Sequence, residues 1–156
     1  ISLTYRIKAE PVVELSAFLQ HDRIGSETLI PVCGAGHANT EMNRFRAGTL
    51  RIIGYPADVF LGAAITRHVL PAISGTCTVS VVTETGLSTA ALQLSQSGLG
   101  VAWVPEALAR PALVRGELTN LTDMLGGIDM DLVAQRWATT TNSATLDAWS
   151  RLTQAV

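Results

Sequence analysis

The stretch "SGLGVAWVPEALA", Ser97–Ala109, decides the fold. Within it, Gly100–Pro105 is almost wholly apolar, with glycines before it and a Pro-Glu pair at its end. A strand with one face in water alternates apolar and polar residues, whereas a strand covered on both faces does not. The stretch therefore predicts a buried parallel strand. Ligands of such sheets bind at the carboxyl ends of the strands, so we expect a ligand cleft near Pro105.

The composition predicts a soluble globular chain. Its 156 residues suffice for one ordinary domain with a hydrophobic core, since 47% of them are hydrophobic and only 15% are charged. No apolar run approaches the roughly 20 residues that a membrane-spanning helix requires, so we expect no membrane partner. The net charge of −2, with Lys and Arg scattered along the chain, is unlike a surface that binds DNA phosphates.

Strand and helix patterns alternate along the chain. Segments rich in β-branched residues and bounded by Gly or Pro predict strands at Thr28–Cys33, Thr49–Gly54, Cys77–Thr83, Gly100–Pro105 and Asp131–Trp137. Apolar residues near a helical repeat predict helices at Val59–Ile73, Leu87–Ser97, Glu106–Arg115 and Ser143–Ala155. Segment Gly34–Gly48 is polar and predicts a loop with at most a short helix. The alternation predicts the α/β class with mostly parallel sheets flanked by helices.

Local signals agree with these helix boundaries. Asp58, Thr85 and Asn142 precede three of the predicted helices, where a side-chain oxygen can bond to a free backbone N–H. Gly98 and Gly116 follow two of them, where glycine is the usual residue after a helix.

Cysteine and histidine do not form a metal or catalytic motif. Cys33 and His37 make a C-x3-H pair, but Cys77 and His68 do not supply the second close pair that a structural zinc site needs. No G-x-S-x-G nucleophile turn and no phosphate-binding lysine loop is present. We therefore expect two buried free thiols, no metal, no cofactor and no catalytic residue. A single disulfide between the two cysteines is the alternative.

Methionine offers a second kind of chemistry, because oxidation makes its side chain polar. Met42, Met124 and Met130 are scattered through the chain, which favours ordinary packing over oxidant sensing.

Two predicted strand-to-helix junctions carry groups suited to a ligand. Gly54–Phe60 offers aromatic rings and a rigid proline, and Thr83–Ser88 offers hydroxyl and amide groups at the start of a helix. Helix amino termini favour anions, so a small organic acid is the expected ligand. Glu84 argues against an acid unless its carboxylate faces away or pairs with Arg6. The alternative for each residue is a purely structural role, such as a helix cap at Thr85.

The segment Ser97–Leu121 resembles the effector-binding domain of LysR-type transcriptional regulators. The family pattern G-x-G-[VI]-[AG]-x-[LV]-P, followed by a helix and an x-G-x-L turn, is matched by Gly98, Gly100, Val101, Ala102, Val104, Pro105, Leu108, Gly116 and Leu118. Upstream, "ETLIPVCGAGH" and "RIIGYPADVFLGAAITRHVLPAI" are similar to the family's entry strand and first ligand-facing unit. The opening "ISLTYR" is similar to the end of another family strand.

The resemblance implies a two-lobed fold like that of type II periplasmic binding proteins, with the first lobe incomplete in this chain. Residues 1–27 would hold the end of the first lobe and a crossover, 28–120 the second α/β lobe, and 121–156 the return strand and helix. The winged helix-turn-helix of the family would lie outside this chain. The implied ligand contacts are Tyr55, Pro56, Phe60, Thr83, Glu84, Thr85, Trp103 and Pro105, with Tyr5 and Arg6 flanking the first crossover.

The implied function is a cytoplasmic sensor domain without enzymatic activity, which binds a small-molecule effector between the lobes and so controls transcription. Its expected partners are a second copy in a homodimer or homotetramer, with Phe60–Ile73 as the candidate contact helix, and DNA through the separate amino-terminal domain. The alternative is an extracytoplasmic solute-binding protein of a transporter, since the same fold serves both. An enzyme on this fold would need a reactive pair of side chains that the sequence does not present.

Overall fold

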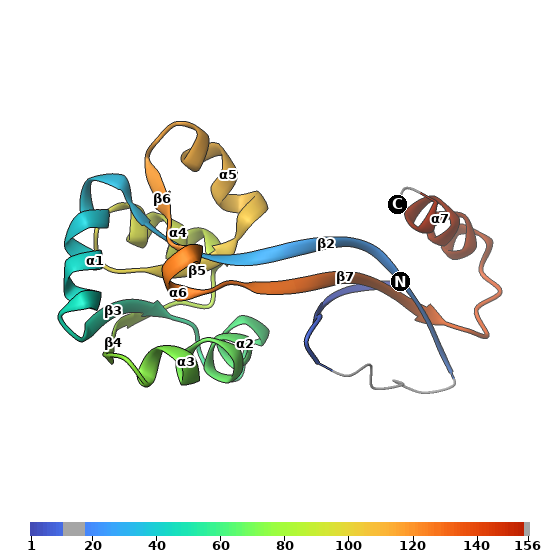
Figure 1. Ribbon diagram of the computed structural model, residues 1–156. Coiled ribbons are helices and arrows are strands. Elements are labelled where there is room, and N and C mark those ends of the chain that lie inside the picture. The colour runs from blue at the N-terminus through green and yellow to red at the C-terminus, as the bar shows by residue number, and fades with distance from the viewer. Residues whose placement is uncertain (11–17, 155–156) are drawn as a thin grey trace. The chain divides into compact units, whose positions relative to one another are not determined.

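The computed structural model describes residues 1–10 and 18–154, in which strands and helices alternate. The chain divides into unit 1, Ile1–Glu27 with Asp129–Val156, and unit 2, Thr28–Ile128. Strands β2, Leu19–Gly34, and β7, Ile128–Trp137, each carry the chain from one unit into the other (Figure 1). The predicted α/β class is confirmed.

Unit 1 contains strand β1, Ser2–Ile7, and helix α7, Ser143–Thr153. β1 pairs antiparallel with β7 along its whole length. Helix α7 begins where the sequence predicts, because the Asn142 side chain accepts a hydrogen bond of 3.1 Å from the backbone N–H of Thr145. The predicted helix end at Ala155 lies outside the described residues.

Unit 2 holds most of the regular structure. Its strands besides β2 are β3 Thr49–Gly54, β4 Thr78–Glu84, β5 Ala102–Pro105 and β6 Leu118–Asn120. Its helices are η1 Ala35–His37, α1 Ala38–Arg46, α2 Phe60–His68, α3 Leu70–Ser74, α4 Ser88–Gln96, α5 Glu106–Val114 and α6 Thr122–Leu125. Gly98 and Gly116 adopt positive φ angles of 84° and 70° after α4 and α5, which confirms the predicted helix ends.

Strand pairing in unit 2 is both parallel and antiparallel. β3 and β4 pair in parallel, and β3 meets Val101, just before β5, through one parallel bridge at Ile52. β2, by contrast, pairs antiparallel with both β5 and β6. The predicted parallel pairing is therefore accompanied by more antiparallel pairing than the pattern indicates. An apolar run shows that a strand is covered on both faces, but it does not set the direction of the neighbouring strands.

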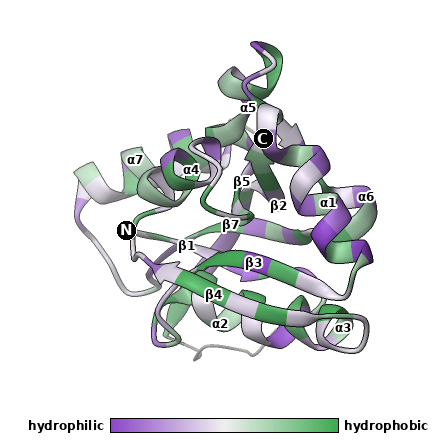
Figure 2. Cartoon of the chain, turned by 90° about the vertical axis from the view of Figure 1, so that its left-hand side faces the viewer, coloured by the Kyte–Doolittle hydropathy of each residue, from purple (hydrophilic) through white to green (hydrophobic). Residues whose placement is uncertain are grey.

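The core of unit 2 lies on both faces of its strands. The four residues Val101–Val104 are fully buried, which explains why this run carries no polar alternation. Helices α2 and α3 lie on one side of the β3–β4 pair, and α1 and α4 lie on the other (Figures 1 and 2). β4 carries several hydrophobic residues (Figure 2). Two of them, Val81 and Val82, are half-exposed.

Two predicted segments differ from the structure. The helix expected at Val59–Ile73 is interrupted at Val69 and continues as α3, because Pro71 has no backbone N–H and restricts the residue before it. The segment expected to be mainly a loop contains the nine-residue helix α1. Only Glu41 and Met42 of α1 are buried, so its sequence shows little apolar periodicity.

Candidate functional site

The two strand-to-helix junctions that the sequence singles out begin side by side. Gly54 is opposite Glu84 at the end of the parallel β3–β4 ladder. One step further, the backbone N–H of Thr85 donates a 3.0 Å hydrogen bond to the Gly54 carbonyl. Parallel strands place their carboxyl ends at one edge of the sheet, and this hydrogen bond joins the two junctions there.

The helices after these junctions begin without a side-chain cap. The N-cap residues are Val59 in α2 and Leu87 in α4, and neither has a side-chain oxygen to accept from the first turn. The predicted cap at Asp58 is therefore not formed. The Thr85 hydroxyl instead accepts from the Leu87 N–H at 3.2 Å, which fixes the turn before α4. Such uncapped amino termini keep donors and a positive dipole end for an anion.

Tyr55 is the most firmly fixed residue of the first junction. Its ring is buried, and its hydroxyl donates a 3.0 Å hydrogen bond to the backbone carbonyl of Trp103. Burial raises the pKa of the Tyr55 phenol well above its usual range, so the hydroxyl stays a hydrogen-bond donor at physiological pH.

The Trp103 side chain belongs to the core. It is fully buried, and its indole Nε1 donates to the carbonyl of Gly126 at 3.1 Å. No part of this ring reaches the surface in the structure, and its predicted contact with a ligand stays a prediction. The other residues predicted for this site in unit 2 do reach the surface: Pro56, Thr83, Thr85 and Pro105 are half-buried, and Phe60 and Glu84 are exposed.

Tyr5 and Arg6, the predicted ligand contacts in unit 1, are half-buried on β1. Arg6 Nη2 donates to Asp131 Oδ2 at 2.8 Å, and Arg23 Nε donates to Asp131 Oδ1 at 2.9 Å. The Arg6 hydrogen bond, followed by that of Arg23, holds the pKa of the Asp131 carboxyl below its usual value. Arg6 is thus already bound to a carboxylate of its own unit.

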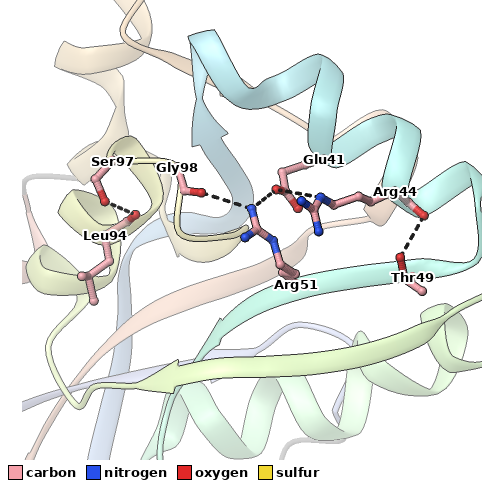
Figure 3. A network of polar contacts seen from close by, with 7 residues as sticks. All are labelled: Glu41, Arg44, Thr49, Arg51, Leu94, Ser97 and Gly98. Carbon is pink, nitrogen blue, oxygen red and sulfur yellow. Dashed lines mark hydrogen bonds and ion pairs between the residues drawn. The ribbon is translucent and has the colours of Figure 1, made fainter.

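Unit 2 also contains a partly buried ion pair that the sequence patterns do not indicate. Glu41 on α1 is fully buried, and its Oε1 accepts a hydrogen bond from Nη2 of Arg51 on β3 (Figure 3). The same Arg51 nitrogen donates to the Gly98 carbonyl at 3.2 Å, so the pair connects α1, β3 and the turn before β5. Glu41 Oε2 and Arg51 Nε are buried without a hydrogen-bond partner. Glu41 and Arg51 are ten residues apart in the sequence, and no sequence pattern with this separation predicts an ion pair.

Both cysteines are buried free thiols, as predicted. Burial, with a smaller effect from the Glu41 charge, raises the pKa of Cys33 to about 11. Burial also raises the pKa of Cys77. Among residues 1–10 and 18–154, no group of three or more His, Cys, Asp or Glu side chains is arranged to hold a metal ion.

Comparison with known proteins shows which solved structures share the fold of this chain. No family model and no curated protein matches the chain, but solved structures do. The LysR family transcriptional regulator VV2_1132 is 25% identical with a TM-score of 0.76, covering 96% of this chain and 49% of its own. The regulatory domain of HypT from Salmonella typhimurium in its apo-form is 20% identical with a TM-score of 0.76, covering 96% and 69%.

A third structure, DarR from Vibrio fischeri in complex with DNA, is 15% identical with a TM-score of 0.75 and covers 99% of this chain and 50% of its own. The chain has the fold of a LysR-type regulatory domain. The resemblance found in Ser97–Leu121 is thereby confirmed, together with the periplasmic-binding-protein-like α/β class. The chain spans about half the length of VV2_1132. None of its described helices is long and apolar enough to cross a membrane.

Proposed function

We propose that the chain is the ligand-sensing part of a cytoplasmic LysR-type transcriptional regulator. One observation carries the proposal: on a LysR-type fold, two uncapped helix amino termini follow adjacent parallel strands joined by the Thr85–Gly54 hydrogen bond. Such an edge is where open α/β sheets bind ligands. The solved structures compared above are transcriptional regulators and their domains, which favours a regulator over a transporter's solute receptor or an enzyme.

The ligand is a small organic acid held at this edge. Its carboxylate accepts hydrogen bonds at the amino termini of α2 and α4, and the half-buried hydroxyls of Thr83 and Thr85 add further partners. Pro56, Phe60 and Pro105 supply apolar surface for its body. The ligand contacts of Tyr5 and Arg6, which lie in unit 1, stay a prediction. Binding shifts the arrangement of a longer regulator, whose own DNA-binding domain then responds.

A thermal-shift screen of organic acids, amino acids and aromatic compounds tests the proposal. A ligand that binds only the folded state stabilises it by about 2.7 kcal/mol at a hundredfold excess over the dissociation constant. We expect an acid to raise the midpoint, and Thr85→Val to abolish the effect. The exposed Thr141, far along the chain from both junctions, gives the matched control Thr141→Val. A screen in which no organic acid raises the midpoint would reject the proposed ligand class.

We further propose that two copies associate through α2 and the neighbouring edge of β4. In unit 2, β4 is paired with β3 on one side, and the half-exposed Val81 and Val82 lie on it. An edge strand with exposed valines favours pairing with another chain.

A further inference from the structure

Unit 2 contains a small pocket on the α2 side of the β3–β4 pair, which we call the α2 pocket. Its volume is about 120 Å³. An apolar cavity of about 150 Å³ accepts a molecule the size of benzene, so this pocket is large enough for a branched alkyl group. Its walls are mainly apolar, and its lining residues include Ile52, Gly54, Ile65, Thr66, Val81 and Glu84.

A β-bulge brings the Glu84 carboxylate to this pocket. In the β3–β4 ladder, Ile52 is opposite Val81 but Ile53 is opposite Thr83, so Val82 is an extra residue. In a regular strand, residues three positions apart point to opposite faces of the sheet. The extra residue shifts this alternation by one, so Val81 and Glu84 both line the pocket. Glu84 therefore faces the α2 side of the pair.

Gly54 makes room for these two side chains. A Cβ atom at Gly54 would lie 2.9 Å from Val81 Cγ1 and 3.2 Å from Glu84 Cγ, closer than side chains normally approach. The Glu84 Oε1 atom would lie 3.7 Å from the same point. The missing side chain thus leaves the Glu84 carboxylate beside the apolar wall that Ile52 and Ile65 form.

Glu84 has no internal counter-charge. Within the described parts of the chain, no side chain forms an ion pair or hydrogen bond with its carboxylate. Its exposed position leaves the carboxylate accessible at the mouth of the pocket. The combination of a free anionic group and a compact apolar wall selects a ligand with one positive charge and a small hydrocarbon body.

We propose that the α2 pocket is a binding site for a small apolar amine. The ammonium group donates to Glu84, the Thr66 hydroxyl at the pocket edge accepts a second hydrogen bond, and the alkyl body contacts Ile52, Ile65 and Val81. This site lies beyond the proposed organic-acid site, because the acid would bind at the helix amino termini. The proposal also explains why an acidic residue, Glu84, lies next to the edge that is proposed to bind an organic acid: its carboxylate lines the α2 pocket instead.

Three probes with the same branched alkyl body test the site: isopentylammonium, isopentanol and isovalerate. Each is titrated into the 156-residue chain while backbone amide chemical shifts are recorded. We expect isopentylammonium to give saturable shifts at Gly54, Thr66 and Glu84, with an affinity roughly 3- to 10-fold above that of isopentanol. Glu84→Gln should remove this preference and leave isopentanol binding unchanged.

Glu106→Gln is the matched control, because Glu106 lies on α5 and does not line the pocket. It should retain the full preference for the ammonium probe. The proposal is overturned if isopentylammonium gives no saturable shifts at the pocket residues, if Glu84→Gln keeps the preference, or if isovalerate binds there as tightly. None of these results bears on the organic-acid site, which is read out by Thr85→Val.

Discussion

The Tyr55 hydroxyl bonds to the Trp103 carbonyl at the point where β3 and β5 stop pairing. One step earlier, the strands exchange backbone hydrogen bonds, since Ile53 N–H donates to the Val101 carbonyl and Val101 N–H donates to the Arg51 carbonyl. A continued parallel ladder would next use a backbone donor from Tyr55. Its side chain donates instead, so a phenol spans the place where the two strands diverge, next to the proposed ligand edge.

Removal of this hydroxyl tests its importance for the fold. Tyr55→Phe keeps the ring but leaves the buried Trp103 carbonyl without this donor, so we expect the free energy of unfolding to fall by about 1–3 kcal/mol. Urea unfolding followed by circular dichroism measures the change. An unfolding free energy within about 0.3 kcal/mol of wild type would mean that water or another donor replaces the phenol.

Removal of one partner of the Glu41–Arg51 pair should lower the free energy of unfolding. Arg51→Met removes the closer of the two arginines that pair with Glu41, whose side chain is about 1% exposed, and leaves only Arg44 at 3.8 Å; we expect a loss of about 2–3 kcal/mol in the free energy of unfolding. Adding Glu41→Gln to that variant should restore part of the loss, because no buried charge then remains. Urea unfolding of the two single variants and the double variant gives the coupling energy.

Arg110→Met is the control for this pair. Arg110 and Glu106 lie on exposed parts of α5 with 3.7 Å between Nη2 and Oε1, so its loss should change stability by less than about 1 kcal/mol. Equal effects of the two arginine substitutions would contradict a special role for the Glu41–Arg51 pair.

The secondary structure could be predicted where apolar periodicity and glycine or proline boundaries coincide. β3 occupies the predicted residues, and α5 ends one residue before the predicted end. Helix α1 was missed because a buried Glu41, rather than an apolar stripe, holds it to β3. β2 begins nine residues before the predicted strand because its first half is polar and largely exposed.

The candidate site could be predicted only in outline. Parallel β3 and β4 had to end at one edge, so the neighbouring positions of Gly54 and Glu84 follow from the alternation of strands and helices. The direction of the Glu84 side chain depends on the bulge at Val82, which no turn residue in the sequence marks. The burial of Trp103 depends on its tertiary neighbours. Which residues contact a ligand remains a prediction.

The carboxylate of Asp131 should make stability depend on acid pH. Its pKa is lowered in the folded chain by Arg6 and then Arg23, so the stabilisation is fully present above the unfolded-state pKa of about 3.9. It is lost as the pH falls through the lower folded-state value. The difference in unfolding free energy between wild type and Asp131→Asn should therefore be greatest near neutral pH and shrink below about pH 4.

Water screens this effect, since the Arg6 and Arg23 side chains are 32% and 50% exposed. Urea titrations between pH 7 and pH 2.5 measure it. Asp147→Asn, which alters an exposed pair with Arg151 at 3.0 Å, is the control and should show little pH dependence. A constant difference between wild type and Asp131→Asn across this range would contradict the assignment.

The two thiols should be unreactive in the folded chain. With a pKa of about 11, only about one Cys33 in a thousand is a thiolate at pH 8, and the side chain is fully buried. Reaction with a chromogenic disulfide reagent should therefore be much slower than that of glutathione, and become rapid in urea. The variants Cys33→Ser and Cys77→Ser show which thiol gives each kinetic phase of the reaction. Rapid native modification of Cys33 would show that its surroundings open.

The proposed association through β4 predicts a specific effect of charge at its surface. Val82 is 38% exposed and does not line the α2 pocket, so Val82→Lys adds a charge without burying it in the unit 2 core. If β4 meets a second copy, two lysines approach each other or lose water, and the association weakens. Val114→Lys on α5, where the valine is 82% exposed, is the matched control. Light scattering over a concentration series should give a lower mass for Val82→Lys alone; an unchanged mass for it, or an equal drop for both variants, would place the contact elsewhere.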